Sequence, residues 1–240
     1  MKFCDLHTHA LPGVDHGARD TDTALQMLQN AVASDVEYVA LTPHFDVSNI
    51  SAQALWEKMQ DQFAALQKAA EGLPIQLALG AEVHISPALM EQLDHIKLPT
   101  INNSRYLLTE FPVAYPESRF APALEELLNR DYIPLVAHPE RYEAVWQRPW
   151  ITEQWLDMGC HLQLTGSSIL GRNGKTVWQA AAELLRRDRV ACVASDAHGV
   201  HERTNYLMGV YDHLSIHFSK AYAQCLLHHN PLRIWQDENL

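Results

Sequence analysis

The chain alternates short apolar segments with stretches of helical periodicity, and this alternation constrains its fold more than any other feature. Segments of this length suit buried strands. Strands that alternate with helices predict βαβ units and a parallel sheet, hence an α/β fold. The expected strands are Phe3–Leu6, Tyr38–Leu41, Gln76–Leu79, Tyr106–Thr109, Ile133–Ala137, His161–Thr165 and Val190–Ala194. The expected helices include Thr23–Ala33, Ala52–Ala70, Ala121–Asn129, Trp178–Arg187 and Ser219–His228.

The length and composition fit one domain over residues 1–240. Hydrophobic residues make up 47% of the 240 and charged residues 20%, which is enough for a sizeable core. We find no Gly/Ser linker, low-complexity tract or abrupt change of composition. The repeating strand–helix units share no motif, so a solenoid is excluded.

The net charge of −11 excludes a protein that grips nucleic acid through its phosphate backbone, because that function needs a basic surface. A local basic pocket for one phosphate remains compatible with this charge. The four cysteines form no CxxC pair, and neither a signal peptide nor an apolar run long enough for a membrane span is visible. We therefore expect a cytoplasmic protein with reduced thiols and no membrane span.

Metal-ligand side chains follow six of the seven expected strands. Because the carboxyl ends of the strands meet at one face of an α/β barrel, these residues are expected to build one metal site there. The 14 histidines of the chain fit this prediction, since imidazole is a common metal ligand. The residues concerned are His7 and His9 after the first strand, His44 after the second, Glu82, Glu110 and His138 after the next three, and Asp196 and His198 after the last.

Individual motifs add chemical detail. His7 and His9 leave an extended chain on the same face, so both can bind one metal. Glu82 lies in an apolar stretch, where a buried carboxylate needs a partner and can bridge two metals. Asp15 and His16, in the turn after the first strand, are both possible ligands, although a plain Pro-Gly turn would look similar.

Two arginines stand close to these ligands in the sequence. Arg141 and Arg203 either fork onto phosphate oxygens or form surface salt bridges with Glu140 and Glu202. The motifs of other phosphate and hydrolase chemistries are absent: there is no GxSxG elbow, no Cys-x5-Arg loop and no GxGxxG cradle. The run over residues 171–176 ends in Gly-Lys-Thr but lacks the first glycine of a P-loop.

Together, these motifs resemble the polymerase and histidinol phosphatase (PHP) superfamily of metal-dependent phosphoesterases. The closest resemblance is to the bacterial manganese-dependent protein-tyrosine phosphatases of capsular and exopolysaccharide loci. It covers most of the chain, and the order and spacing of the motifs make it specific. The motifs are Asp5–His9, Leu11–Asp15, Thr42–His44, Gly80–Glu82, Glu110–Pro112, Ala137–Tyr142, Leu162–Thr165 with Ser168–Gly171, and Ser195–His198.

The resemblance implies a distorted seven-stranded (β/α) barrel that holds two or three divalent metals, most often Mn, with Fe or Zn as alternatives. The implied ligands are His7, His9, Glu82 and Asp196 for one metal, Glu82, Glu110 and His138 for a second, and His44 and His198 with His16 (or Asp15) for a third. The chain departs from the family at three positions. His16 stands where an acidic residue is usual, Phe45 where a second histidine is common, and His84 where a basic residue is frequent.

The implied activity is the hydrolysis of phosphate monoesters, above all of protein phosphotyrosine, in the regulation of capsular or exopolysaccharide synthesis. Asp196 or His198 is expected to assist proton transfer, and Arg141 and Arg203 to bind the phosphate. The implied partner is a phosphotyrosine-containing protein, a bacterial tyrosine autokinase, and an oligomer remains open. The alternatives are a small-molecule phosphatase acting on histidinol phosphate or a nucleotide, and a weakly catalytic PHP module that binds or regulates.

Overall fold

The computed structural model describes residues 2–112 and 115–240. Its strands are β1 (Phe3–Thr8), β2 (Val36–Leu41), β3 (His44–Phe45), β4 (Gln76–Leu79), β5 (Glu82–His84), β6 (Tyr106–Glu110), β7 (Ile133–Ala137), β8 (His161–Thr165) and β9 (Cys192–Ala194). Its α-helices are α1 (Thr21–Ala33), α2 (Ala52–Ala69), α3 (Pro87–Met90), α4 (Phe120–Leu128), α5 (Glu143–Gln147), α6 (Ile151–Asp157), α7 (Gly166–Ile169), α8 (Lys175–Arg186), α9 (Met208–His217), α10 (Lys220–Gln224) and α11 (Asn230–Trp235). Short 3-10 helices cover Ile101–Asn103, Glu117–Arg119 and Pro139–Arg141.

The strands pair in parallel throughout, which confirms the α/β class. They form two sheets, with the orders β1-β2-β4 and β3-β5-β6-β7-β8-β9. An isolated bridge between Thr8 and Ala197 links the first sheet to the segment after β9. In the described parts of the chain no continuous ladder closes these sheets into one ring, so the structure does not bear out the closed seven-stranded barrel.

The division into two sheets has a local cause. Pro43, which has no N–H to donate, lies between β2 and β3, and residues 80–81 lie between β4 and β5. At Gly80 an added Cβ would lie 3.1 Å from the Cα of Ile101, so a side chain there would require the neighbouring backbone to move by a few tenths of an ångström. Each chain segment therefore leaves the first sheet and enters the second after a two-residue step.

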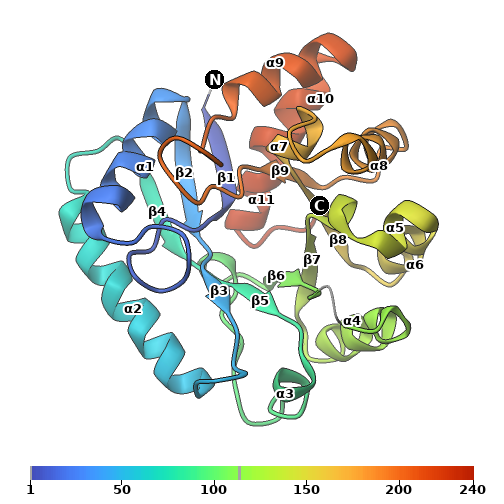
Figure 1. Ribbon diagram of the computed structural model, residues 1–240, viewed down its shortest axis with the longest axis horizontal. Coiled ribbons are helices and arrows are strands. Elements are labelled where there is room, and N and C mark those ends of the chain that lie inside the picture. Colours follow the sequence, from blue (N-terminus) through green and yellow to red (C-terminus); the bar gives the residue numbers. More distant parts are fainter. Residues whose placement is uncertain (1, 113–114) are drawn as a thin grey trace.

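The helices cover the outside of the strands. Figure 1 shows α1, α2, α4, α6 and α8 around the rim, with the strands inside. The buried positions of α8 recur at helical spacing along one face, which packs into the hydrophobic core. Side chains define where helices begin: Asp20 accepts a hydrogen bond from the N–H of Thr23, and Ser51 accepts one from that of Ala54.

All seven expected strands are present, but the C-terminal helices differ from the prediction. The expected helix Ser219–His228 is α10 followed by a π-helix over Cys225–His229. Helix α9 has no counterpart among the predicted elements, because only Val210 and Leu214 are buried in it and its apolar periodicity is weak. No helix in the described residues is both long and apolar enough to cross a membrane.

Candidate metal centre

Strand β1 delivers two fully buried imidazoles to the carboxyl ends of the strands. The Nε2 atoms of His7 and His9 lie 3.1 Å apart. The Oε2 atom of Glu82, at the start of β5, lies 3.2 Å from Nε2 of His7 and 3.3 Å from Nε2 of His9. Glu82 is only 1% exposed, so this carboxylate faces the two imidazoles and almost no solvent.

Glu82 also contacts two histidines from other strands. Its Oε1 lies 2.8 Å from Nε2 of His138, and its Oε2 lies 3.2 Å from Nδ1 of His44. At the end of β6, Oε1 of Glu110 lies 3.7 Å from Nε2 of His138, and Oε2 of Glu110 lies 3.6 Å from Nδ1 of His44. The carboxylate of Glu82 is thus the centre of the cluster, and Glu110 lies on its solvent side.

Three histidine rings border the cluster beside His9. His198 stacks on His9 with ring centroids 3.8 Å apart, and His16 lies 4.6 Å from His198 and 5.0 Å from His44 by the same measure. Asp15 has a different place. Its Oδ2 accepts hydrogen bonds from Nδ1 of His9 (2.6 Å) and from the backbone N–H of His44 (3.0 Å), so it orients His9 from behind.

The donor set fits divalent metals. Ligand atoms lie within 4.8 Å of one another in three overlapping groups: His7, His9 and Glu82; His44, Glu82 and Glu110; and His9, His44 and His198. Nδ1 of His44 and Nε2 of His198 are buried without a hydrogen-bond partner among the described residues. Buried polar atoms are normally satisfied, and a cation would satisfy these two. Imidazole and carboxylate ligands suit Mn, Fe and Zn.

Asp196 joins the cluster to both arginines. Its Oδ1 lies 3.6 Å from Nε2 of His7, and its Oδ2 lies 2.7 Å from Nη2 of Arg141 and 2.8 Å from Nη2 of Arg203. In the part of the chain that the structure describes, neither arginine forms the salt bridge with Glu140 or Glu202 that the sequence left open. The arginines instead border the cluster, where they can reach a bound anion.

The charges of the cluster are strongly coupled. Burial alone would lower the pKa of His9, but its hydrogen bonds to Asp15 and Glu82 outweigh burial and raise this pKa to about 10. Burial lowers the pKa of His198 to about 3, and the positive charge of His9 adds to this effect. Burial would raise the pKa of Asp196, but His7 and Arg141 outweigh it and lower this pKa. In the metal-free protein the cluster therefore contains carboxylates balanced by protonated imidazole.

The backbone is strained at two of these positions. His138 and Asp196 have φ values of 35° and 52°, in the left-handed region that non-glycine residues rarely adopt. Such strain is frequent at functional sites, where it aims side chains inward. Gly17 is needed for another reason: a Cβ there would lie 2.0 Å from the carbonyl oxygen of His9.

The sequence analysis missed two residues that hold the ligands. The buried Gln163 of β8 lies with its Oε1 2.9 Å from Nδ1 of His7, and the hydroxyl of Tyr142 donates to the carbonyl of Ala137 while accepting from the N–H of Phe111. Gln163 lies inside a buried strand, between Leu162 and Leu164. A polar side chain at such a position is the signal in the sequence that could have identified this residue. His84, noted as a departure, contacts Glu110 at 3.3 Å.

Comparisons with known proteins identify the family of the chain. A family model described as "Capsular polysaccharide synthesis, CpsB/CapC" matches residues 3–236. A tyrosine-protein phosphatase, CpsB of Streptococcus pneumoniae, is 27% identical, with 98% of each chain covered. A putative tyrosine-protein phosphatase, CapC of Staphylococcus aureus, is 30% identical, with 92% of this chain and 85% of the relative covered.

Solved structures extend the comparison. A structure from a study of YwqE from Bacillus subtilis and CpsB from Streptococcus pneumoniae, described as unique metal-dependent tyrosine phosphatases, has a TM-score of 0.88. It is 26% identical and the match covers 99% of this chain and 96% of the other. A lactonase from Listeria monocytogenes has a TM-score of 0.57 at 12% identity, which shows a shared fold alone.

Proposed function

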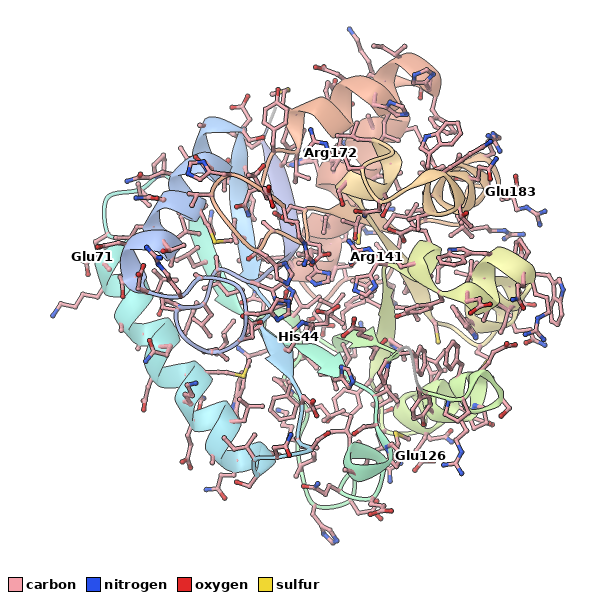
Figure 2. All side chains as sticks on the ribbon, in the orientation of Figure 1. His44, Glu71, Glu126, Arg141, Arg172 and Glu183 are labelled. Carbon is pink, nitrogen blue, oxygen red and sulfur yellow. The ribbon has the colours of Figure 1, made fainter. Side chains whose placement is uncertain are left out.

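Since this chain belongs to the CpsB/CapC family of capsular polysaccharide synthesis, we propose that it is a metal-dependent tyrosine-protein phosphatase. The observation that carries the proposal is the cluster around Glu82, where imidazoles and carboxylates from several strand ends meet beside Arg141 and Arg203. Relatives named tyrosine-protein phosphatases match over almost the whole chain. Figure 2 labels His44 and Arg141, which lie together near the centre of the view.

We propose two or three divalent metals, with Mn as the first candidate. His7, His9, Glu82 and Asp196 would hold one, and Glu82, Glu110 and His138 a second. The third would take His44, His198 and His16. The contacts of Asp15 with His9, Gly17 and His44 leave this carboxylate committed to hydrogen bonds, which favours His16 over Asp15 as the ligand. Bound metals would supply an activated water and offset the negative charge of the phosphate.

The chain's own residues have distinct parts in this proposal. Arg141 and Arg203 reach the same oxygen of Asp196 and are placed to bind the phosphoryl oxygens, over which negative charge is spread in the transition state. Asp196 or His198 would assist proton transfer. The pKa of Asp196 is lowered and that of His198 is about 3, so neither group holds a proton at pH 7, and each would accept a proton from the attacking water rather than protonate the leaving phenolate.

A cavity beside Arg141 is the candidate binding site for the phenyl ring of phosphotyrosine. This cavity of about 390 Å³ is lined by Arg141, Tyr142, Phe111, Phe120 and Trp146. Aromatic walls suit a phenyl ring, and the guanidinium suits its phosphate. We propose that this cavity takes the phosphotyrosine side chain, and that the physiological partner is a cytoplasmic protein with phosphotyrosine, such as a tyrosine autokinase.

The test compares phosphate release from a phosphotyrosyl peptide and from histidinol phosphate, each with Mn²⁺ and with EDTA. We expect metal-dependent release with preference for the peptide. Preference for histidinol phosphate would move the function to small molecules. Tight metal binding without release from either substrate would indicate a binding or regulatory module.

A pair of variants tests the central carboxylate. Glu82→Gln removes the negative charge that lies between four imidazoles. We therefore expect loss of bound metal and at least about a hundredfold loss of activity, because metal catalysis depends on the residues that bind the metals directly. Glu71→Gln, at an exposed position far from His44 in Figure 2, is the matched control and should change neither. Full metal content and full activity in Glu82→Gln would refute the central role of Glu82.

A further inference from the structure

A second cavity borders the cluster beside Arg203. It measures about 360 Å³ and lies between the loop before α8 and the segment after β9. We name it the Arg172 pocket. It includes Arg172, Asn173, His201, Glu202, Arg203 and Tyr206.

The charge of the Arg172 pocket is unusual for this chain. Two arginines, Arg172 and Arg203, and one carboxylate, Glu202, line it in a protein with a net charge of −11, and Arg203 is paired with Asp196. Most arginines pair with carboxylates; Arg187, for example, contacts both Glu183 and Glu153. Arg172 has neither an ion pair nor a side-chain hydrogen bond among the described residues. Its guanidinium is therefore available to an external anion.

The backbone that carries Arg172 is held in place. The N–H of Arg172 donates to the carbonyl of Ser167 at 2.9 Å. The side-chain amide of Asn173 donates to the hydroxyls of Ser167 and Ser168, both at 2.9 Å. Because the loop is fixed by these bonds, an anion would meet a prepared site and would order only the arginine side chain.

The Arg172 pocket is continuous with the candidate active site. Arg203 lines the pocket and donates to Asp196 at 2.8 Å, and Ser195, which also lines it, directly precedes Asp196. The aromatic cavity is lined by Glu117 and Glu143 beside Arg141, and Glu117 is paired with Arg148. A substrate whose phosphate lies beside Arg203 would thus have the Arg172 pocket next to it.

We propose that the Arg172 pocket is a subsite for a second anionic group of the same substrate chain, next to the phosphotyrosine. The anion is a side-chain carboxylate or a second phosphoryl group, and Arg172 is the residue that makes the enzyme prefer it. The inference rests on the proposed phosphatase function, because it assigns a neighbour to the phosphotyrosine at the same site. Figure 2 labels both Arg172 and Arg141.

The test uses the metal-loaded enzyme and a series of phosphotyrosyl peptides. Each carries one Glu, phosphoserine, Ala or Lys at one to three residues on either side of the phosphotyrosine. We expect kcat/KM about three- to fivefold higher for the best anionic peptide than for its Ala counterpart, the size of one solvent-exposed ion pair. The preference should weaken at high salt, because the pocket is open to solvent.

Variants assign the preference to the pocket. Arg172→Gln should reduce it to within about twofold, and Arg172→Glu should reverse it in favour of Lys, while turnover of p-nitrophenyl phosphate stays at the wild-type value. Arg186→Gln is the matched control, since it removes the same charge from an exposed position of the neighbouring helix α8. The preference should survive in this control.

The outcomes distinguish a carboxylate from a phosphoryl group as the bound anion, and they distinguish failure of the subsite from failure of the proposed phosphatase function. A gain with Glu peptides alone assigns a carboxylate, and a gain with phosphoserine peptides alone assigns a phosphoryl group; either supports the subsite. Metal-dependent turnover with no charge preference, or a preference unchanged in Arg172→Gln, overturns the subsite and leaves the phosphatase function intact. Absence of turnover with every phosphotyrosyl peptide overturns the proposed function and the subsite with it.

Discussion

Gln163→Met tests whether a residue that touches no metal sets the metal affinity of the centre. Gln163 is fully buried, and its Oε1 lies 2.9 Å from Nδ1 of His7. The acceptor holds a proton of His7 on Nδ1 and orients the ring so that Nε2, the atom that would bind a metal, lies beside Glu82 and Asp196. Methionine has a similar volume, so the substitution removes the hydrogen bond without a large cavity.

The size of the effect follows from this contact. A buried N–H that loses its acceptor costs about 1–3 kcal/mol. Loss of a partner that orients a metal-bound histidine typically lowers metal affinity or activity by about 10–100-fold, or about 1.4–2.8 kcal/mol at 1.4 kcal/mol for each factor of ten. The first value is an expected loss of folding stability and the second a loss of metal binding, so we expect Gln163→Met to weaken Mn²⁺ binding by about 10–100-fold.

The assay is a titration of the metal-free protein with Mn²⁺, followed by kcat/KM at saturating metal. Thr109→Val is the matched control, because Thr109 is also buried in the second sheet but its hydroxyl donates, among the described residues, to the carbonyl of Leu135 alone, at 3.4 Å. The control should bind metal as the wild type does. If Gln163→Met unfolds more easily but keeps wild-type metal affinity, then Gln163 only packs the sheet and the reasoning is wrong.

Two further measurements address the turn after β1 and the protons of the cluster. The pKa of His9 is about 10 in the metal-free protein, so its ring is protonated at pH 7 and must lose a proton to bind a metal. Calorimetry in buffers of different ionisation enthalpy should therefore show proton release, and the metal affinity should rise as the pH rises toward 10. A binding enthalpy that does not depend on the buffer would contradict this. Gly17→Ala should lower the free energy of unfolding by about 1–3 kcal/mol in denaturant titrations and weaken metal binding, because its Cβ would lie 2.5 Å from that of His9; wild-type values for both would show that the turn moves freely.

The parallel order of the strands explains why much of the site could be predicted. Once strands and helices alternate, the carboxyl ends of the strands must lie together, and any ligands there must meet. His7, Glu82, His138 and Asp196 lie far apart in the sequence but contact one another for this reason. Their contacts follow from the topology, and their roles as ligands stay a prediction until metal is measured.

The remaining features of the fold and of the site depend on details of the backbone that hydrophobic periodicity does not encode. The division into two sheets follows from the short connections that contain Pro43 and Gly80, and the hydrophobic pattern of the strands does not reveal these connections. The choice between Asp15 and His16 depends on a turn that places the Asp15 carboxylate behind His9. Likewise, the shared contact of Arg141 and Arg203 with Asp196 depends on left-handed backbone at Asp196 and Arg203.

These details point to one physical account of the centre. Glu82 and Asp196 are nearly fully buried, and left-handed backbone of the kind seen at His138 and Asp196 costs about 1–3 kcal/mol at each residue. In the metal-free protein, protonated imidazole and the two arginines balance the carboxylates. Divalent cations would replace those protons and leave the arginines free to turn from Asp196 to a phosphate. The same contact that stabilises the metal-free cluster thus places both guanidinium groups where the substrate must bind.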